Sequence, residues 1–190
     1  MYAVVVYQSK YGAAKKYAQW IAEALGCDIK ENKNLKAEAL LPYDTIIYGG
    51  GLYAESIAGV GLITKHLSLL EGKKLIVYTT GLTPVDCREY YDKLVAEKNF
   101  KGDSLSKIKV YHFPGRMFLH ELSFVHKTAI KTLKKLMAGK ETPTEMEKLL
   151  VKLCDTEGDF TDKQALKDLL DYAKEGEDAR ENTNETVRLV

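Results

Sequence analysis

Three short segments rich in glycine and hydroxyl groups carry the residues of this chain that are best suited to binding a ligand. They are residues 8–14 (QSKYGAA), 49–54 (GGGLYA) and 79–83 (TTGLT), called here the first, second and third segments. Each follows a run of apolar, β-branched and aromatic residues that is typical of a buried strand. Glycine lets another molecule come close to the backbone, and hydroxyl groups donate hydrogen bonds to it. The three segments therefore indicate a binding site, provided that the fold brings them together.

The first segment is suited to an anion. Residues 13–25 have apolar side chains at spacings of three and four, which predicts an amphipathic helix that ends at Gly26. The first amides of such a helix have no acceptor within it and lie at the positive end of the helix dipole. A phosphate there would accept hydrogen bonds from the Ser9 hydroxyl and from the backbone amides of Lys10, Tyr11, Gly12, Ala13 and Ala14. The alternative is an ordinary strand-to-helix turn with nothing bound.

The order of the elements predicts where the three segments lie. Strands are expected at residues 3–7, 44–48, 74–78 and 108–113, with a polar edge strand at 27–31, and helical patterns separate them. Strands that alternate with helices form a parallel sheet through right-handed crossovers, with helices on both faces. The chain is therefore expected to be a doubly wound α/β protein. All three segments then meet at the carboxyl edge of the sheet, where such folds bind ligands.

The last third of the chain is expected to be helical. Residues 118–137 combine an apolar stripe with a face rich in lysine, which is either a solvated face or a docking surface for an acidic partner or an anionic membrane. Capping signals at residues 142–145 and 161–164 begin two further helices. We expect one domain over residues 1–174, with a helical extension at about 142–174, followed by an acidic, flexible tail at 175–190.

The overall composition excludes several classes of function. With 190 residues and a net charge of +1, the chain fits one domain and has no bulk attraction for nucleic acid. It has no apolar run of the roughly 20 residues that span a bilayer and no signal peptide, so a cytoplasmic location is expected. Three widely spaced cysteines predict neither a disulfide framework nor a metal site. No nucleophile with an adjacent base is recognisable, so no residue is predicted to be catalytic.

The sequence resembles the flavodoxin family, and within it proteins related to menaquinone-dependent protoporphyrinogen oxidase. The resemblance covers nearly the whole chain and rests on residues 7–12 (YQSKYG), residues 48–54 (YGGGLYA), and residues 115–117 (GRM) ahead of 122–124 (LSF). It implies a flavodoxin-like three-layer α/β/α sandwich with a five-stranded parallel sheet in the order 2-1-3-4-5, and FMN as the cofactor. The first segment would hold the FMN phosphate. The isoalloxazine ring would be flanked by Gly51, Leu52, Tyr53, Ala54, Thr79, Thr80, Gly81 and Leu82.

The first segment departs from the usual flavodoxin pattern at one point. The family usually has serine or threonine where Ala14 stands, and Ala13 also lacks a hydroxyl. Losing one neutral hydrogen bond costs about 0.5–1.5 kcal/mol, so FMN binding is expected to be weaker but not abolished. The segment has no G-x-G-x-x-G pattern, which argues against FAD and nicotinamide nucleotides.

The leading hypothesis is an FMN-dependent redox protein that exchanges electrons with a partner protein or a quinone. Two alternatives stay open. One is an oxidoreductase that resembles quinone-dependent protoporphyrinogen oxidase, which peripheral membrane contact through the basic helix at 118–140 would favour. The other is a flavin-free interaction domain, which a colourless protein that ignores added FMN would favour.

Overall fold

A parallel sheet forms the centre of the molecule. The computed structural model describes residues 2–175 of the chain. The five parallel strands of the sheet are β1 (Ala3–Gln8), β2 (Asp28–Glu31), β3 (Thr45–Tyr53), β5 (Lys74–Gly81) and β6 (Ile108–Pro114). They lie in the order β2-β1-β3-β5-β6. Counting only the parallel strands, this is the order 2-1-3-4-5 that the resemblance implies. The sequence did not predict β4 (Ser56–Ile57), a two-residue antiparallel strand that pairs with the end of β3.

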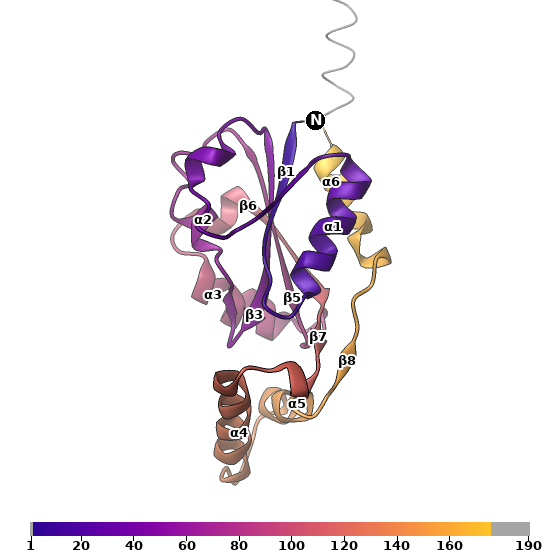
Figure 1. Ribbon diagram of the computed structural model, residues 1–190. Coiled ribbons are helices and arrows are strands. Elements are labelled where there is room, and N and C mark those ends of the chain that lie inside the picture. The colour runs from indigo at the N-terminus through magenta and orange to yellow at the C-terminus, as the bar shows by residue number, and fades with distance from the viewer. Residues whose placement is uncertain (1, 176–190) are drawn as a thin grey trace, which may run out of the picture.

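Helical layers cover both faces of the sheet, which confirms the three-layer α/β/α sandwich (Figure 1). Successive residues of a strand point to opposite faces, so Val4 and Val6 of β1 join one core while Val5 and Tyr7 join the other. The second of these cores lies under α1 (Ala13–Leu25) and α6 (Lys167–Lys174). The first is covered by shorter elements: η1 (Ala37–Leu40), α2 (Gly61–Thr64), η2 (Glu89–Val95), α3 (Ala96–Asn99) and η3 (Ser104–Lys107).

Two of these shorter elements differ from the pattern in the sequence. The apolar spacing over residues 60–70 suggests a regular helix, yet α2 has four residues and the rest of the segment is a series of turns. Val60, Ile63 and Leu70 are nevertheless buried, because turns can bury the same apolar positions as a helix. In the next helical segment, Leu94 follows the buried Tyr90 and Tyr91 at helical spacing, yet it is 43% exposed. It lies in η2, a π-helical segment whose wider turn changes which side chains share a face.

A long excursion leaves the sheet after β6. Its base is a two-stranded antiparallel pairing of β7 (Arg116–Met117) with β8 (Gly158–Asp159). Between these strands lie η4 (Leu119–Glu121), α4 (Phe124–Ala138) and α5 (Glu145–Leu153), and we call residues 118–157 the excursion. In Figure 1, α4 and α5 lie beyond the end of the sheet, and the chain then returns through β8 and η5 (Gln164–Leu166) to α6 beside α1.

The structure refines the helices expected in this part of the chain. The helix expected from residue 118 begins at Phe124, because residues 118–122 form a 3-10 turn and Ser123 takes the N-cap position. The capping box at the start of α5 is present, with Thr144 and Glu147 bonding to each other's backbone amides. Of the extension expected at 142–174, α5 lies in the excursion and α6 covers the sheet. The tail expected at 175–190 lies outside the described residues, apart from Glu175. No helix within residues 2–175 is long and apolar enough to cross a membrane.

Candidate functional site

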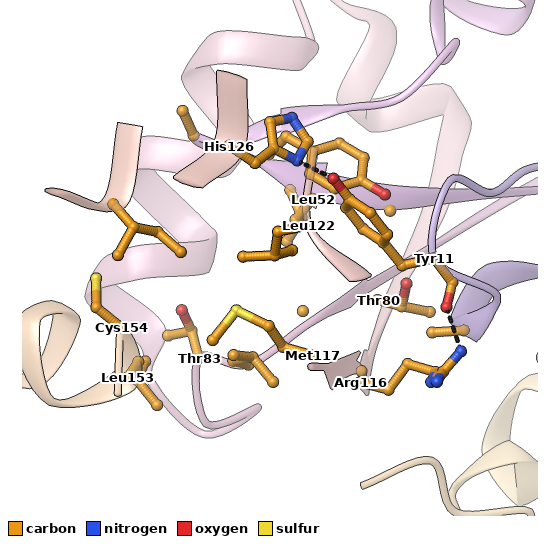
Figure 2. A pocket seen from close by; sticks show the side chains of 18 of the residues that line it. Tyr11, Leu52, Thr80, Thr83, Arg116, Met117, Leu122, His126, Leu153 and Cys154 are labelled. Carbon is orange, nitrogen blue, oxygen red and sulfur yellow. Dashed lines mark hydrogen bonds between the residues drawn. The ribbon is translucent and has the colours of Figure 1, made fainter. Parts of the chain in front are cut away.

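A cavity of about 480 Å³ opens at the carboxyl edge of the sheet, where all three segments meet (Figure 2). Its walls come from the loop between β1 and α1, the ends of β3 and β5, β7, and the facing sides of α4 and α5. Eleven of the fourteen predicted site residues line it: Ser9, Tyr11, Ala13, Ala14, Gly51, Leu52, Tyr53, Ala54, Thr80, Gly81 and Leu82. Parallel strands thus bring together residues from sequence positions 9 to 82, as expected.

The other three predicted residues do not line the cavity. Lys10 is exposed, and its ammonium group donates to the hydroxyl of Ser123 at the start of α4 over 3.0 Å. Gly12 forms the turn into α1 rather than a wall. Thr79 is fully buried, and its hydroxyl lies 2.8 Å from Nδ1 of His112 on the neighbouring strand. The side chain of Thr79 is therefore engaged within the sheet.

The first segment has the geometry of an anion-binding turn. Gly12 has a φ of 92°, a conformation that glycine adopts readily and other residues rarely. Its amide donates to the hydroxyl oxygen of Ser9 over 3.1 Å, which leaves the Ser9 proton free to point elsewhere. The helix begins at Ala13 and has no acidic residue in its first turn. Its unpaired amides and the positive end of its dipole therefore face the cavity without a competing negative charge.

The glycine run of the second segment belongs to β3 itself. Gly49 pairs with Tyr78 of β5, and a Cβ on Gly49 would lie 1.9 Å from the ring of Tyr78. A Cβ on Gly50 would lie 2.7 Å from the carbonyl oxygen of Ala58, and one on Gly51 2.8 Å from the Tyr53 hydroxyl. None of the three has a positive φ. The close approach of neighbouring groups therefore explains the run.

The second segment ends in a strained turn. Ala54 and Glu55 have φ values of 45° and 60°, which glycine or asparagine adopts more easily. Asn99 of α3 donates to the carbonyl oxygen of Glu55 over 2.6 Å, and Lys98 donates to that of Ala54 and pairs with the Glu55 carboxylate at 3.2 Å. Backbone strain of this kind persists where the surroundings fix it and is common beside ligand sites. Here α3 fixes the edge of the cavity.

Tyr53 stands at the mouth of the cavity in an aromatic cluster. Its ring centroid lies 4.9 Å from that of His126 and 5.9 Å from that of Tyr11. Burial raises the pKa of the Tyr53 hydroxyl to about 12, so this group stays protonated near neutral pH. Tyr53 thus lines the cavity and also packs against a neighbouring helix, because His126 belongs to α4.

Five polar residues that line the cavity were not among the predicted site residues: Glu55, Thr83, Tyr90, Arg116 and His126. Arg116 lines the cavity, and its Nη1 donates to the carbonyl oxygen of Tyr11 over 2.8 Å. His126 also lines it, with Nδ1 2.7 Å from the Tyr11 hydroxyl, as Figure 2 shows. Burial and the charge of Lys10 lower the pKa of His126, which favours the neutral ring. The sequence did contain a signal for Arg116, which directly follows a predicted strand and a glycine. It contained no signal that His126 lies at the site, because the position of α4 depends on how the excursion folds back onto the sheet.

Tyr11 is the residue that joins these groups. Its hydroxyl accepts a bond from the Ser123 amide over 3.2 Å, in addition to its contact with His126. Burial acts to raise the pKa of this hydroxyl, but the bonds to Ser123 and the charge of Lys10 outweigh it, so the pKa lies below its ordinary value. The start of α4 is therefore tied to the first segment.

The side of the cavity away from the first segment is apolar. The excursion and β7 supply most of this wall: Met117, Leu122, Ala129, Ile130, Leu133, Leu150, Leu153 and Cys154. Burial raises the pKa of the Cys154 thiol, so it behaves as a small apolar group. The cavity thus combines donors for an anion at one end with room for an apolar or aromatic group at the other.

The topology and the cavity define a flavodoxin-like α/β protein with a glycine turn, at the carboxyl edge of its sheet, that has a geometry suited to an anion. The flavodoxin domain family matches residues 4–145, and this chain belongs to that family. A comparison with curated proteins found no match.

Several solved structures resemble this chain at low similarity. Flavodoxin 2 from Bacillus cereus is 21% identical over 59% of this chain and 84% of its own, with a TM-score of 0.39. A putative flavoprotein from Bacteroides eggerthii is 14% identical over 73% and 99%, with a TM-score of 0.43. A flavodoxin from the domain Archaea is 13% identical over 92% and 99%, with a TM-score of 0.38. Because every one of these scores is below 0.5, family membership rests on the family match alone.

Proposed function

We propose that this protein binds FMN in the cavity and transfers electrons between redox partners. The observation that carries the proposal is the turn at Gly12, which opens the unpaired amides of α1 onto a 480 Å³ cavity in a chain of the flavodoxin domain family. The amides of Tyr11, Ala13 and Ala14 and the Ser9 hydroxyl would bind the phosphate, while the amides of Lys10 and Gly12 hold the Tyr53 and Ser9 hydroxyls beside it. The ends of β3 and β5, with Tyr53 and Leu82, would flank the ring. When bound, the flavin supplies the electron chemistry.

The chain's own residues would set the environment of the bound ring. Tyr53 contributes an aromatic face, and the apolar wall from α4 and α5 excludes water from the far side. The neutral His126 and the Tyr11 hydroxyl share one hydrogen bond at the cavity. This pair holds a proton between Oη of Tyr11 and Nδ1 of His126, without a formal charge.

The cofactor content of the purified protein tests this proposal. We expect a yellow protein with flavin absorption bands, or a colourless one that binds added FMN with quenching of its fluorescence. Heat release followed by mass spectrometry should recover FMN. Recovery of FAD or a nicotinamide nucleotide would contradict the choice of cofactor. A folded, colourless protein that ignores FMN would contradict the proposal and favour a flavin-free interaction domain.

The apolar wall favours a second candidate function, a quinone-dependent oxidoreductase of the kind that the resemblance to protoporphyrinogen oxidase suggests. A partner protein needs only an exposed ring edge, whereas Ile130, Leu133 and Leu150 build a chamber suited to an apolar small molecule. In such a reaction the bound flavin would supply two electrons, and the chamber would hold the quinone that takes them up with two protons to become a hydroquinone.

Reoxidation of the dithionite-reduced protein by a short-chain quinone tests this second function. Leu133→Asp places a charge in the chamber, so it should slow reoxidation while FMN stays bound. Leu136→Asp is the matched control, because Leu136 lies on the same helix but is 62% exposed. Equal reoxidation rates in both variants and the wild type would contradict a quinone site in the chamber. Electron transfer to a partner protein would then be the function to test.

A further inference from the structure

We propose that Arg116 binds the phosphate group of the cofactor and so determines the preference for FMN over riboflavin. This inference deepens the proposed function and depends on it. Arg116 follows Gly115, whose amide donates to the carbonyl oxygen of Gly81 over 2.6 Å. A Cβ on Gly115 would lie 3.0 Å from the Gly81 backbone, so only glycine lets the chain cross the end of β5 this closely. The crossing directs the Arg116 side chain toward the first segment.

The guanidinium group lies against the turn that would bind the phosphate. Nη1 donates to the carbonyl oxygen of Tyr11, and a Cβ built on Gly12 would lie 3.2 Å from the same nitrogen. The rest of the side chain is held on both sides. Nη2 pairs with the Glu121 carboxylate at 2.9 Å, and the guanidinium carbon lies 5.0 Å from the centre of the Phe118 ring. The side chain is 23% exposed, so its position is set by the protein (Figure 2).

Part of this guanidinium has no partner in the protein. Among the described residues, Nε of Arg116 is the one buried side-chain nitrogen or oxygen without a hydrogen bond. A buried donor without an acceptor is costly, and native proteins seldom keep one unless a ligand or water completes it. Arginine has five N–H donors in a rigid fork that suits phosphate oxygens. An oxyanion in front of the first segment would supply the acceptor that Nε lacks.

The electrostatic setting also points to an anion. Arg116 places a positive charge next to the start of α1, where the helix dipole is itself positive and no acidic residue occupies the first turn. Glu121 offsets part of that charge from the far side. A phosphate dianion between the guanidinium and the helix would interact favourably with both. A charge-assisted bond from Arg116 would also replace the hydroxyl bond that Ala13 and Ala14 cannot make.

The experiment compares the affinities of FMN and riboflavin, which differ only in the phosphate. Both are titrated by fluorescence quenching with the wild type and with Arg116→Met. A charge-assisted hydrogen bond corresponds to a change in Kd of about 10- to 100-fold. We therefore expect the Kd for FMN to rise by about that factor in Arg116→Met and the Kd for riboflavin to stay the same. Arg88→Met is the matched control, because Arg88 is largely exposed and pairs with Asp92.

Other results of the FMN and riboflavin titrations would contradict the inference. If Arg116→Met weakens both ligands equally, or neither, Arg116 only holds β7 in place and the inference is wrong. If that variant does not fold, as judged by circular dichroism, Arg116→Lys decides. Lysine keeps the charge without the fork, so the ratio of the two affinities must fall, and an unchanged ratio overturns the inference. A wild type that binds neither flavin overturns the proposed function and this inference together, whereas FMN binding with an unchanged ratio overturns this inference alone.

Discussion

The hydroxyl of Tyr11 and Nδ1 of His126 lie 2.7 Å apart, although 115 residues separate them in the chain. This bond joins the turn of the first segment to the first turn of α4. Together with the bonds to Ser123, it ties the excursion to the sheet at the rim of the cavity. The wall that the excursion adds to the cavity therefore has a fixed position relative to the anion-binding turn.

Removing the Tyr11 hydroxyl should loosen this connection. In Tyr11→Phe the start of α4 loses its bonds to residue 11, at a cost of about 1 kcal/mol in the free energy of unfolding. Hydrogen exchange at residues 124–128 should accelerate, while exchange in β1 and α1 should not change. Tyr111→Phe is the control, because it removes a single hydroxyl bond, to the Asp168 carbonyl, on the side of α6. Unchanged exchange in α4 would show that the excursion is held by its apolar contacts alone.

Gly12→Val should abolish FMN binding and leave the secondary structure largely intact. A branched side chain at a φ of 92° strains the turn, and its Cβ would lie 3.2 Å from Nη1 of Arg116. Gly26→Val provides the matched control, since Gly26 also has a positive φ but has no neighbour within 4 Å of its Cβ position. FMN titration with far-UV circular dichroism measures both properties. Normal affinity in a folded Gly12→Val protein would place the phosphate elsewhere.

Tyr53 is expected to stack on the flavin ring. Tyr53→Ala should restore fluorescence to bound FMN and weaken binding by about 0.5–1.5 kcal/mol, the contribution of an aromatic pair beyond its buried area. Tyr53→Phe keeps the ring and loses the hydroxyl that bonds to the backbone at Lys10, so quenching should persist. Steady-state emission of the saturated complexes distinguishes the variants. If Tyr53→Ala quenches like the wild type, Tyr11 or Leu82 becomes the candidate for the stacking partner.

His112 should make the protein less stable in mild acid. Its ring stacks on Tyr91 at 3.9 Å and contacts the Thr79 hydroxyl, and burial lowers its pKa to about 4. In the unfolded chain the ring takes up a proton near pH 6.5, so between pH 6.5 and 4 the unfolded state binds more protons than the folded state. Stability is therefore lost as the pH falls through this range. The loss between pH 7 and pH 5 should be about 2 kcal/mol.

Urea denaturation at the two pH values measures this effect. The loss should be much smaller in His112→Gln, which cannot take up a proton. His120→Gln, whose side chain is 77% exposed, serves as the control and should behave like the wild type. An equal loss in wild type and His112→Gln would assign the acid sensitivity to other groups, including His126, whose lowered pKa acts in the same direction.

The outer face of α4 is expected to contact anionic membranes. Phe124 is 84% exposed, and at the helical spacing of α4 it shares one face with the exposed lysines at 127, 131 and 135. The wild type should sediment with phosphatidylglycerol vesicles and not with phosphatidylcholine vesicles. A variant with glutamate at Lys127, Lys131 and Lys135 should lose this binding.

A second triple variant controls for net charge. Glutamate at the exposed residues Lys33, Lys36 and Lys101, none of which lies in the excursion, makes the same change in charge. This variant should bind the vesicles nearly as well as the wild type. Equal loss in the two variants would mean that only overall charge matters, and no sedimentation of the wild type would identify the basic face as a solvated one.

The parallel strands of the sheet could be predicted from the sequence because each of them has a local signal. The run of Val4, Val5 and Val6 and the alternation of strands with helices predicted a parallel sheet. Eleven of the residues that were expected at its carboxyl edge line one cavity. Thr79 and Thr80 were both predicted, but neighbouring residues of a strand point to opposite faces, so Thr80 lines the cavity and Thr79 does not.

The excursion could be predicted only in part. Its helices have the apolar spacing and caps that single sequences reveal, but their position depends on the pairing of Met117 with Gly158 and on the Tyr11 hydroxyl. Contacts between residues so far apart leave no periodic pattern. His126 was therefore interpreted as a structural histidine, and the role of Arg116 could not be seen before its neighbours were known.

The packing of α6 on α1 has a consequence for synthesis on the ribosome. The amide of Asp162 donates to the hydroxyl of Tyr17 across 145 residues, and Leu166, Leu169 and Ala173 complete the core over α1. At about 5–20 residues per second, roughly 7–30 s pass between the synthesis of these two parts. Much of the opposite face can close earlier, because η1, α2 and η2 precede residue 108 and, among the covering residues that the structure describes, only Met146 and Leu150 of α5 pack against that core later. A nascent chain thus exposes one apolar face for most of its synthesis, a period when chaperones would be needed most.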